Sequence, residues 1–318
     1  MKIDIKPGRR QFLGSASLVG VGAVLASCAP SMATTSAKPN LDLAVLNFAL
    51  NLEFLEAAFY LAAVGRLAEL DKLGLNSGGG GTSIILPTGS NSKQKAFTGA
   101  RNGGMKFNNP NIQGYAQEIA EDELNHVKFL LKVLGSNAVV RPTLDIGPAF
   151  GNAAKAATKA DAALAFSPYD DGGPNDLYFL HGAFIFEDVG VTAYKGAARL
   201  LTDDNAGGVL DSAAGILAVE AYHAGQIRTL LYANRDADTG YGVDVKTLIG
   251  LISDLRGAVG GGKDQGLVVG GKANINPTDA NSVAFSRTTR EVLNIVYLGP
   301  DATKGGFFPD GLNGAITK

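Results

Sequence analysis

The pattern Glu-x-x-His occurs twice in the chain, as Glu-Leu-Asn-His at residues 123–126 and as Glu-Ala-Tyr-His at residues 220–223. Helical residues three apart lie on one face, about one turn from each other, so each stretch directs a carboxylate and an imidazole to the same side. The chain has three histidines, and two of them stand in this pattern. Each stretch therefore predicts half of a metal site, with Glu123, His126, Glu220 and His223 as ligands.

A second repeat lies upstream of each of these stretches. Glu53 is followed at the seventh position by Tyr60, and Glu187 is followed at the seventh position by Tyr194. The apolar residues around each glutamate recur at steps of three and four, which is the spacing of one helical face. The two repeats together indicate two copies of a helix pair, each with one glutamate helix and one Glu-x-x-His helix.

The order of the predicted helices indicates an all-α fold. Long helices are predicted at residues 40–73, 111–134, 175–201 and 205–234. The long crossover between the second and third helices contains an alanine-rich stretch, residues 153–166, that is compatible with an extra helix. A long connection at this place is typical of a ferritin-like four-helix bundle rather than of a simple up-and-down bundle.

The segments outside the helices set the predicted domain limits. The bundle is expected to span residues 40–235. Residues 75–111 are rich in glycine, proline and asparagine and are predicted to be a surface excursion with room for a short hairpin. Residues 236–318 are predicted to be a loop-rich C-terminal extension packed on the bundle, with helices at 247–259 and 290–298.

Residues 1–33 have the features of an export signal. Arg9 and Arg10 precede an apolar run that is too short to span a bilayer, which resembles a twin-arginine signal, an address for folded cargo. The residues around Cys28 resemble a lipoprotein cleavage box, with Cys28 as the lipidated residue. The alternative is cleavage after Ala33, which discards Cys28. Both readings predict a periplasmic or cell-envelope protein, and the first attaches it to a membrane only through a lipid at Cys28.

The charge balance argues against a nucleic-acid partner. The chain of 318 residues has a formal net charge of -2 at pH 7 and no run of basic residues. Binding to nucleic acid generally requires a basic patch or stripe that neutralises phosphates. The expected partners are therefore metal ions and a small oxidant rather than DNA or RNA.

The predicted ligands suit a pair of divalent metal ions. Glu53, Glu123, Glu187 and Glu220 would gather in a helical core, where unpaired ionised carboxylates are costly. Two divalent cations would cancel these four negative charges, and His126 and His223 would supply one imidazole to each. A mixed set of carboxylates and imidazoles suits iron or manganese. Tyr60 and Tyr194, two turns from a glutamate on the same face, are expected to hydrogen bond to ligating carboxylates, unless they are plain core residues.

Several neighbouring residues offer alternatives to this ligand set. Glu56 could replace Glu53 as the ligand, but Glu53 is favoured because its tyrosine partner repeats in the second half. Four other polar residues are given structural roles: Glu121 and Asp122 on a solvated face, Asp188 behind the metal ligands or at the surface, and His181 as a hydrogen-bonded structural histidine.

The duplicated ligand pattern resembles the ferritin-like superfamily. Within that superfamily, LNFALNLEFLEAAFY at 46–60, EIAEDELNHVKFL at 118–130, VLNIVYLG at 292–299 and GGFFPDGLNG at 305–314 are similar to exported ferritin-like, desiccation-related proteins of bacteria, plants and fungi. This resemblance implies the fold and an association with stress.

Three functions agree with this sequence. The first is a dinuclear iron or manganese protein that reacts with dioxygen or peroxide, as an oxidase or a catalase-like enzyme. The second is a metal-binding stress-protection protein without turnover, and the third is a structural module in which the metal stabilises the fold. The sequence leaves the oligomeric state open and is compatible with a dimer.

Overall fold

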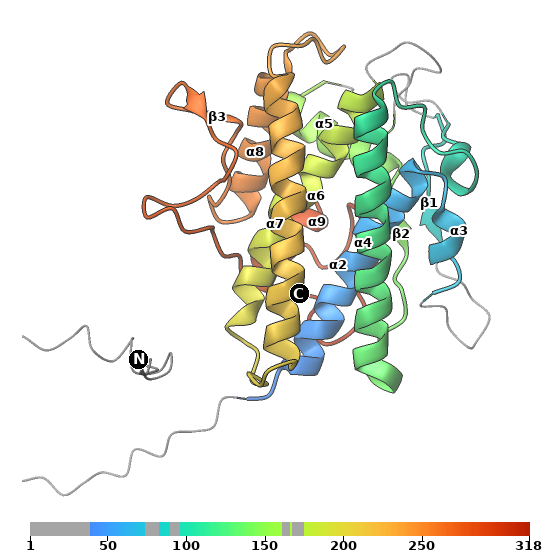
Figure 1. Cartoon of the computed structure of the whole chain (residues 1–318), viewed down its shortest axis with the longest axis vertical. Coiled ribbons are helices and arrows are strands. Elements are labelled where there is room, and N and C mark those ends of the chain that lie inside the picture. Colours follow the sequence, from blue (N-terminus) through green and yellow to red (C-terminus); the bar gives the residue numbers. More distant parts are fainter. Residues whose placement is uncertain (1–38, 74–82, 90–95, 161–165, 167–174) are drawn as a thin grey trace, which may run out of the picture. The chain divides into compact units, whose positions relative to one another are not determined.

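The computed structural model describes residues 39–73, 83–89, 96–160, 166 and 175–318. Its long helices are α2 (Asp42–Ala63), α4 (Pro110–Leu134), α6 (Asn175–Ala198) and α7 (Val209–Ala233). Helix α2 packs along α4, α6 packs along α7, and α2 also contacts α6, so the four helices form a bundle (Figure 1). The predicted all-α four-helix bundle with a long crossover between its second and third helices is confirmed. The predicted export signal and Cys28 lie outside the described residues.

Helix α4 shows how local sequence sets the ends of these elements. The Asn109 side chain accepts a hydrogen bond from the Asn111 amide at 2.9 Å, which caps the first turn. Pro110 occupies the first helical position, where its missing N–H costs nothing. The helix stops at Gly135, whose φ of 52° is readily adopted only by glycine.

Helix α2 is the core helix of the bundle. It is long and apolar enough by composition to cross a membrane, but 83% of its most apolar window is buried inside the protein. The prediction of one helix from residue 40 to residue 73 was wrong at its C-terminal end. The chain turns at Gly65, where φ is 80° and an added Cβ would lie 2.4 Å from the Gly104 amide nitrogen. A short helix, α3 (Leu67–Leu70), follows the turn.

The segment 75–111 is joined to the crossover by a short pair of strands. Strand β1 (Ile84–Ile85) pairs in parallel with β2 (Leu144–Asp145) of the crossover, so its main partner is distant in sequence rather than the other arm of a hairpin. A single antiparallel bridge joins Thr88 to Ala96. Ala100 and Met105 are buried, but most described residues of this segment are exposed or half-buried, as expected of a surface excursion.

The remaining predicted helices are present, but they begin or end at other residues than expected. The crossover helix is α5 (Pro148–Thr158), which begins earlier than expected because proline again takes the first helical position. The extension after the bundle contains α8 (Val245–Val259) and α9 (Thr289–Val296). Between them lies a small antiparallel ladder of β3 (Val268–Val269) and β4 (Lys272–Ala273).

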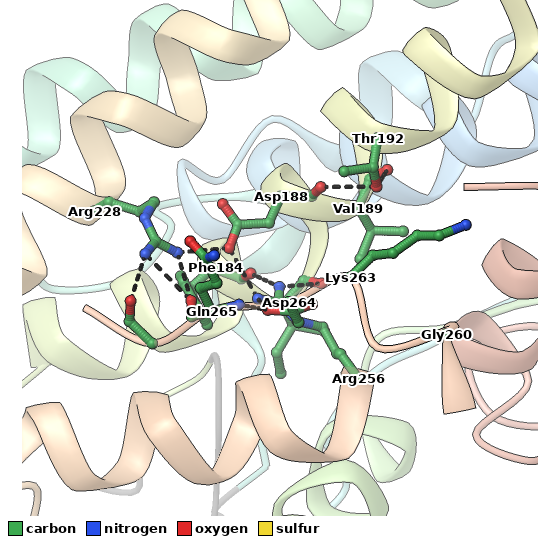
Figure 2. Close-up of polar contacts among 12 residues, drawn as sticks. Phe184, Asp188, Val189, Thr192, Arg228, Arg256, Gly260, Lys263, Asp264 and Gln265 are labelled. Atoms are coloured by element: carbon green, nitrogen blue, oxygen red, sulfur yellow. Dashed lines mark hydrogen bonds and ion pairs between the residues drawn. The ribbon is translucent and has the colours of Figure 1, made fainter. Parts of the chain in front are cut away.

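The C-terminal extension is fastened to the bundle by buried charges. Helix α8 contacts α5 and α7, and α9 contacts α6. Figure 2 shows Asp188 of α6 facing Arg228 of α7 and Arg256 of α8, with Nη–Oδ2 distances of 2.8 and 2.9 Å. Asp264 continues the network, because its two oxygens accept from Arg256 at 2.7 Å and from Arg287 at 2.8 Å. Three guanidinium groups and two carboxylates thus join bundle and extension.

Gly196 provides a test of the close approach between α6 and the extension. A Cβ added to Gly196 would lie 1.8 Å from the Arg287 carbonyl oxygen, so Gly196→Ala forces two backbones apart. We expect destabilisation of about 1 to 3 kcal/mol or more, as for other overpacked sites.

The control is Gly215→Ala on α7, where no atom lies within 4 Å of the added Cβ. It should stabilise the protein by up to about 1 kcal/mol, because alanine favours a helix over glycine. Urea unfolding measures both, and equal stabilities would contradict the packing.

Candidate metal centre

The predicted ligands converge from all four helices of the bundle. Helix α2 supplies Glu53, α6 supplies Glu187, and α4 and α7 supply the two Glu-x-x-His pairs. The four carboxylates are at most 1% exposed, and His126 and His223 are 9% and 5% exposed. The side chains form two groups whose potential ligand atoms lie within 4.8 Å of one another. The groups are Glu53, Glu123, His126 and Glu220, and Glu123, Glu187 and His223.

The first group is centred on the imidazole of His126. Its Nδ1 lies 3.2 Å from Glu53 Oε2, 3.6 Å from Glu123 Oε2 and 3.7 Å from Glu220 Oε1. These three carboxylates come from three different helices. One imidazole nitrogen therefore faces oxygen donors from α2, α4 and α7.

The second group is arranged in the same way around His223. Its Nδ1 lies 3.2 Å from Glu123 Oε1 and 3.7 Å from Glu187 Oε2. Glu123 belongs to both groups and turns one oxygen toward each histidine. Glu123 would therefore be a donor common to both groups.

The donor atoms fit metal ions better than they fit one another. Both carboxylate oxygens of Glu123 and of Glu220, together with Glu187 Oε2 and His223 Nδ1, are buried without a hydrogen-bond partner among the described residues. Buried polar atoms without partners are costly and uncommon. Carboxylates mixed with imidazoles are suitable donors for iron and manganese. The residues present thus fit a pair of divalent cations.

The electrostatics of the cluster show how strongly the carboxylates interact. Burial and the neighbouring Glu123 raise the pKa of Glu53 to about 7, although His126 opposes this effect. Burial likewise raises the pKa of Glu187 to about 8. Burial alone would lower the pKa of His126, but the surrounding carboxylates outweigh it and raise that pKa to about 11. Without metal, the cluster therefore retains protons that offset its negative charge.

The two tyrosines connect the two halves of the bundle. The Tyr60 hydroxyl donates a hydrogen bond to Glu187 Oε1, and the Tyr194 hydroxyl donates one to Glu53 Oε1. Each tyrosine therefore bonds the glutamate of the opposite repeat, not the glutamate on its own helix. In both glutamates the second oxygen is directed toward a histidine. The tyrosines hold the carboxylates with one oxygen facing the cluster.

Asp122 has a role that the sequence analysis missed. Its side chain is 39% exposed, as predicted for a solvated face, but its Oδ2 also lies 3.2 Å from His223 Nε2. When Nε2 carries the proton and donates it in a hydrogen bond to Asp122, the unprotonated Nδ1 faces the cluster. Metal-binding histidines commonly donate their other ring N–H to a carboxylate in this way. Val219 precedes the second Glu-x-x-His stretch where Asp122 precedes the first. The two halves of the centre are therefore not equivalent.

Glu56 is a further buried carboxylate beside the predicted ligands. It is 5% exposed, and its pKa is raised well above the usual value by burial and by the charges of Glu123 and Glu53. Glu56 and Glu220 both approach Gly190 of α6. A Cβ at Gly190 would lie 2.4 Å from Glu220 Oε2 and 3.3 Å from Glu56 Oε1. The absence of a side chain at Gly190 makes room for both carboxylates.

The other polar residues near the centre lie as follows. Glu121 is on the surface, where it pairs with Arg66 at 2.7 Å. Asp188 is buried and pairs with arginines, so the surface alternative for it was wrong. His181 is fully buried, but the expectation of a hydrogen-bonded histidine was wrong. Neither of its ring nitrogens has a partner in the part of the chain that the structure describes, and burial lowers its pKa to about 3.

The comparisons with known proteins agree with this geometry. The ferritin-like domain family matches residues 41–233. The chain is 30% identical over 309 residues to the ferritin-like catalase Nec2 of Nesocodon mauritianus, covering 92% of this chain and 90% of that protein. It is 33% identical over 270 residues to the desiccation-related protein PCC13-62 of Craterostigma plantagineum, covering 80% and 77%. No solved structure matches the chain significantly. The resemblance predicted from the duplicated motif is confirmed.

Proposed function

The chain belongs to the ferritin-like domain family, and we propose that it is a dinuclear iron or manganese protein that decomposes hydrogen peroxide. The observation that carries the proposal is the pair of donor groups sharing Glu123. The similarity to a relative named a ferritin-like catalase, along nearly the whole length of both chains, supports peroxide as the substrate.

The residues of the chain have separate tasks in this reaction. A bound pair of iron or manganese ions would supply the change of oxidation state and the open coordination positions that peroxide chemistry needs. Glu53, Glu123, His126, Glu187, Glu220 and His223 would hold the pair. Tyr60 and Tyr194 orient Glu187 and Glu53 through hydrogen bonds. Asp122 orients His223 and links it to the surface, since its side chain is 39% exposed.

Metal analysis and oxygen evolution test the proposal directly. The protein purified from its own cell should contain close to two ions of iron or manganese per chain. It should convert two molecules of hydrogen peroxide into two of water and one of dioxygen, which an oxygen electrode follows. Two bound ions without oxygen evolution would refute the catalytic function.

The second candidate function is metal binding for stress protection without turnover. It is supported by the similarity to a desiccation-related protein. It predicts that metal addition raises the unfolding temperature, because a ligand that binds the folded state stabilises it. Under this alternative the reduced, fully metallated protein shows no spectral response to peroxide or dioxygen over hours.

The hydrogen bonds from Tyr60 and Tyr194 can be tested by removing one hydroxyl at a time. Tyr60→Phe or Tyr194→Phe removes one donor to a ligating carboxylate and leaves the ring in place. We expect oxidation of the reduced metal pair to slow by about 10 to 100-fold, with metal content near normal. Stopped-flow spectroscopy measures the rate. Tyr222→Phe on α7 is the control, because that side chain is 76% exposed, and an equal effect there would contradict the role.

We also propose that the protein is exported by the twin-arginine route and anchored by a lipid at Cys28, from the pattern of residues 1–33. Folding before export would let the protein load its metal in the cytoplasm. Changing Arg9 and Arg10 to lysine should trap the precursor in the cytoplasm. Cys28→Ser should release the mature protein from the membrane fraction, and unchanged membrane association would exclude the lipid anchor.

A further inference from the structure

Two adjoining cavities lie between the bundle and the C-terminal extension. The inner cavity, of about 20 Å³, is bounded by α2, α6 and α9. The outer cavity, of about 40 Å³, is bounded by α5, α6, α8 and α9. Ile185, Ile295 and Phe307 line both cavities and form the wall between them. Several residues of the outer cavity, such as Leu255 and Leu298, are partly exposed, so it is the one nearer to solvent.

The lining of both cavities is almost entirely apolar. The charged side chain in the outer cavity is Arg256, whose guanidinium is held by Asp188 and Asp264. The charged side chain in the inner cavity is Glu56. A volume of about 20 Å³ is enough for one water-sized molecule, but apolar walls give a water few hydrogen-bond partners. The cavities therefore suit a small apolar molecule.

The inner cavity reaches the metal centre at Gly190. Gly190 and Glu56 form part of its wall. The Glu220 carboxylate stands directly against Gly190, with Oε2 within 2.4 Å of the position that a Cβ would take. A molecule in the inner cavity is thus separated from a predicted metal ligand by a residue without a side chain.

We propose that the two cavities form a path for dioxygen between solvent and the metal centre, with Glu56 and Gly190 at its inner end. Dioxygen is apolar, and its transfer from water into apolar surroundings is favourable. Hydrogen peroxide would lose its hydrogen bonds to water along the same walls, which is costly. Peroxide reaches the centre instead from its polar side, where Asp122 is partly exposed beside His223. This inference rests on the proposed function, because dioxygen is the product of peroxide decomposition.

The first test does not depend on metal or turnover. Crystals of the mature protein under xenon pressure should bind xenon in both cavities, since apolar cavities take up this atom. Val296→Phe fills the inner cavity alone and should remove xenon from it. Leu255→Phe fills the outer cavity alone and should remove xenon there. Wild-type protein without xenon in either cavity would overturn the path.

The second test separates dioxygen from peroxide. The reduced, metal-loaded protein is mixed with dissolved dioxygen or with hydrogen peroxide in a stopped-flow spectrometer. Val296→Phe and Leu255→Phe should each slow oxidation by dioxygen at least about tenfold and leave oxidation by peroxide unchanged. Leu255 is half-exposed, so Leu255→Phe is expected to fold even if Val296→Phe does not. Equal slowing with both oxidants would overturn the selectivity for dioxygen.

A third cavity provides the matched control. It lies beside Tyr194 and is lined by Ala197 of α6. Ala197→Leu fills that cavity and should change neither rate. Slowing of the dioxygen reaction by Ala197→Leu alone would place the path there and refute the one proposed. If wild-type protein reacts with neither oxidant, the proposed function fails, while the xenon experiment still decides whether the path exists.

Discussion

Replacing both His126 and His223 with alanine is expected to abolish the dinuclear site. Each donor group contains one imidazole, and the Nδ1 atom of each imidazole faces carboxylates from other helices at 3.2–3.7 Å. Without the imidazoles, the remaining donors are carboxylates alone, which bind iron and manganese less selectively. Metal content measured after purification should fall from about two ions per chain to near zero. Each single variant should lose part of its metal.

The control for this experiment changes the residues that precede the histidines. Asn125 and Tyr222 occupy the same two stretches, but both side chains are exposed. The double variant with alanine at these positions should retain both ions and the unfolding temperature of the wild type. Full metal content in the double histidine variant would refute the ligand assignment. Loss of metal in the control would show that any change in these helices disturbs the centre.

Asp264→Asn is expected to destabilise the protein by about 3 to 5 kcal/mol, because it breaks a buried ionic network. Asp264 lies between Arg256 and Arg287, and its side chain is 2% exposed. The network contains three arginines and two aspartates, so loss of one carboxylate leaves two uncompensated positive charges in the interior. Substitution by asparagine keeps the shape and removes the charge, which isolates the electrostatic contribution. The midpoint of urea unfolding, followed by circular dichroism, measures the effect.

The matched control is Asp236→Asn. Asp236 pairs with Lys246 at 2.7 Å, but the two side chains are 64% and 43% exposed. Exposed ion pairs typically contribute less than about 1 kcal/mol, so this variant should unfold close to the wild type. A small effect of Asp264→Asn, comparable with that of the control, would mean that apolar packing alone holds the extension on the bundle.

The predictions that succeeded were those carried by helical periodicity. Spacing of three and four residues placed Glu53, Glu187 and the two Glu-x-x-His pairs on buried faces, and the structure buries all of them. The predictions that failed concerned places where distant segments meet. The first long helix was extended past Ala63 because nothing nearby in sequence reveals the close approach of Gly65 to Gly104. His181 was assigned a hydrogen bond that the described residues around it do not supply.

Helical periodicity was enough to predict the four-helix bundle, the two repeated halves and the residues that face its centre, because it specifies directions around a helix axis. The pairing of residues across helices became visible only in the packed structure. The exchange of hydrogen bonds between halves, from Tyr60 to Glu187 and from Tyr194 to Glu53, depends on how the two helix pairs are packed. Packing also brings Asp122 to His223. It likewise places Asp188 and Asp264 where both accept hydrogen bonds from Arg256. Such contacts join positions far apart in the chain, and local periodicity carries no information about them.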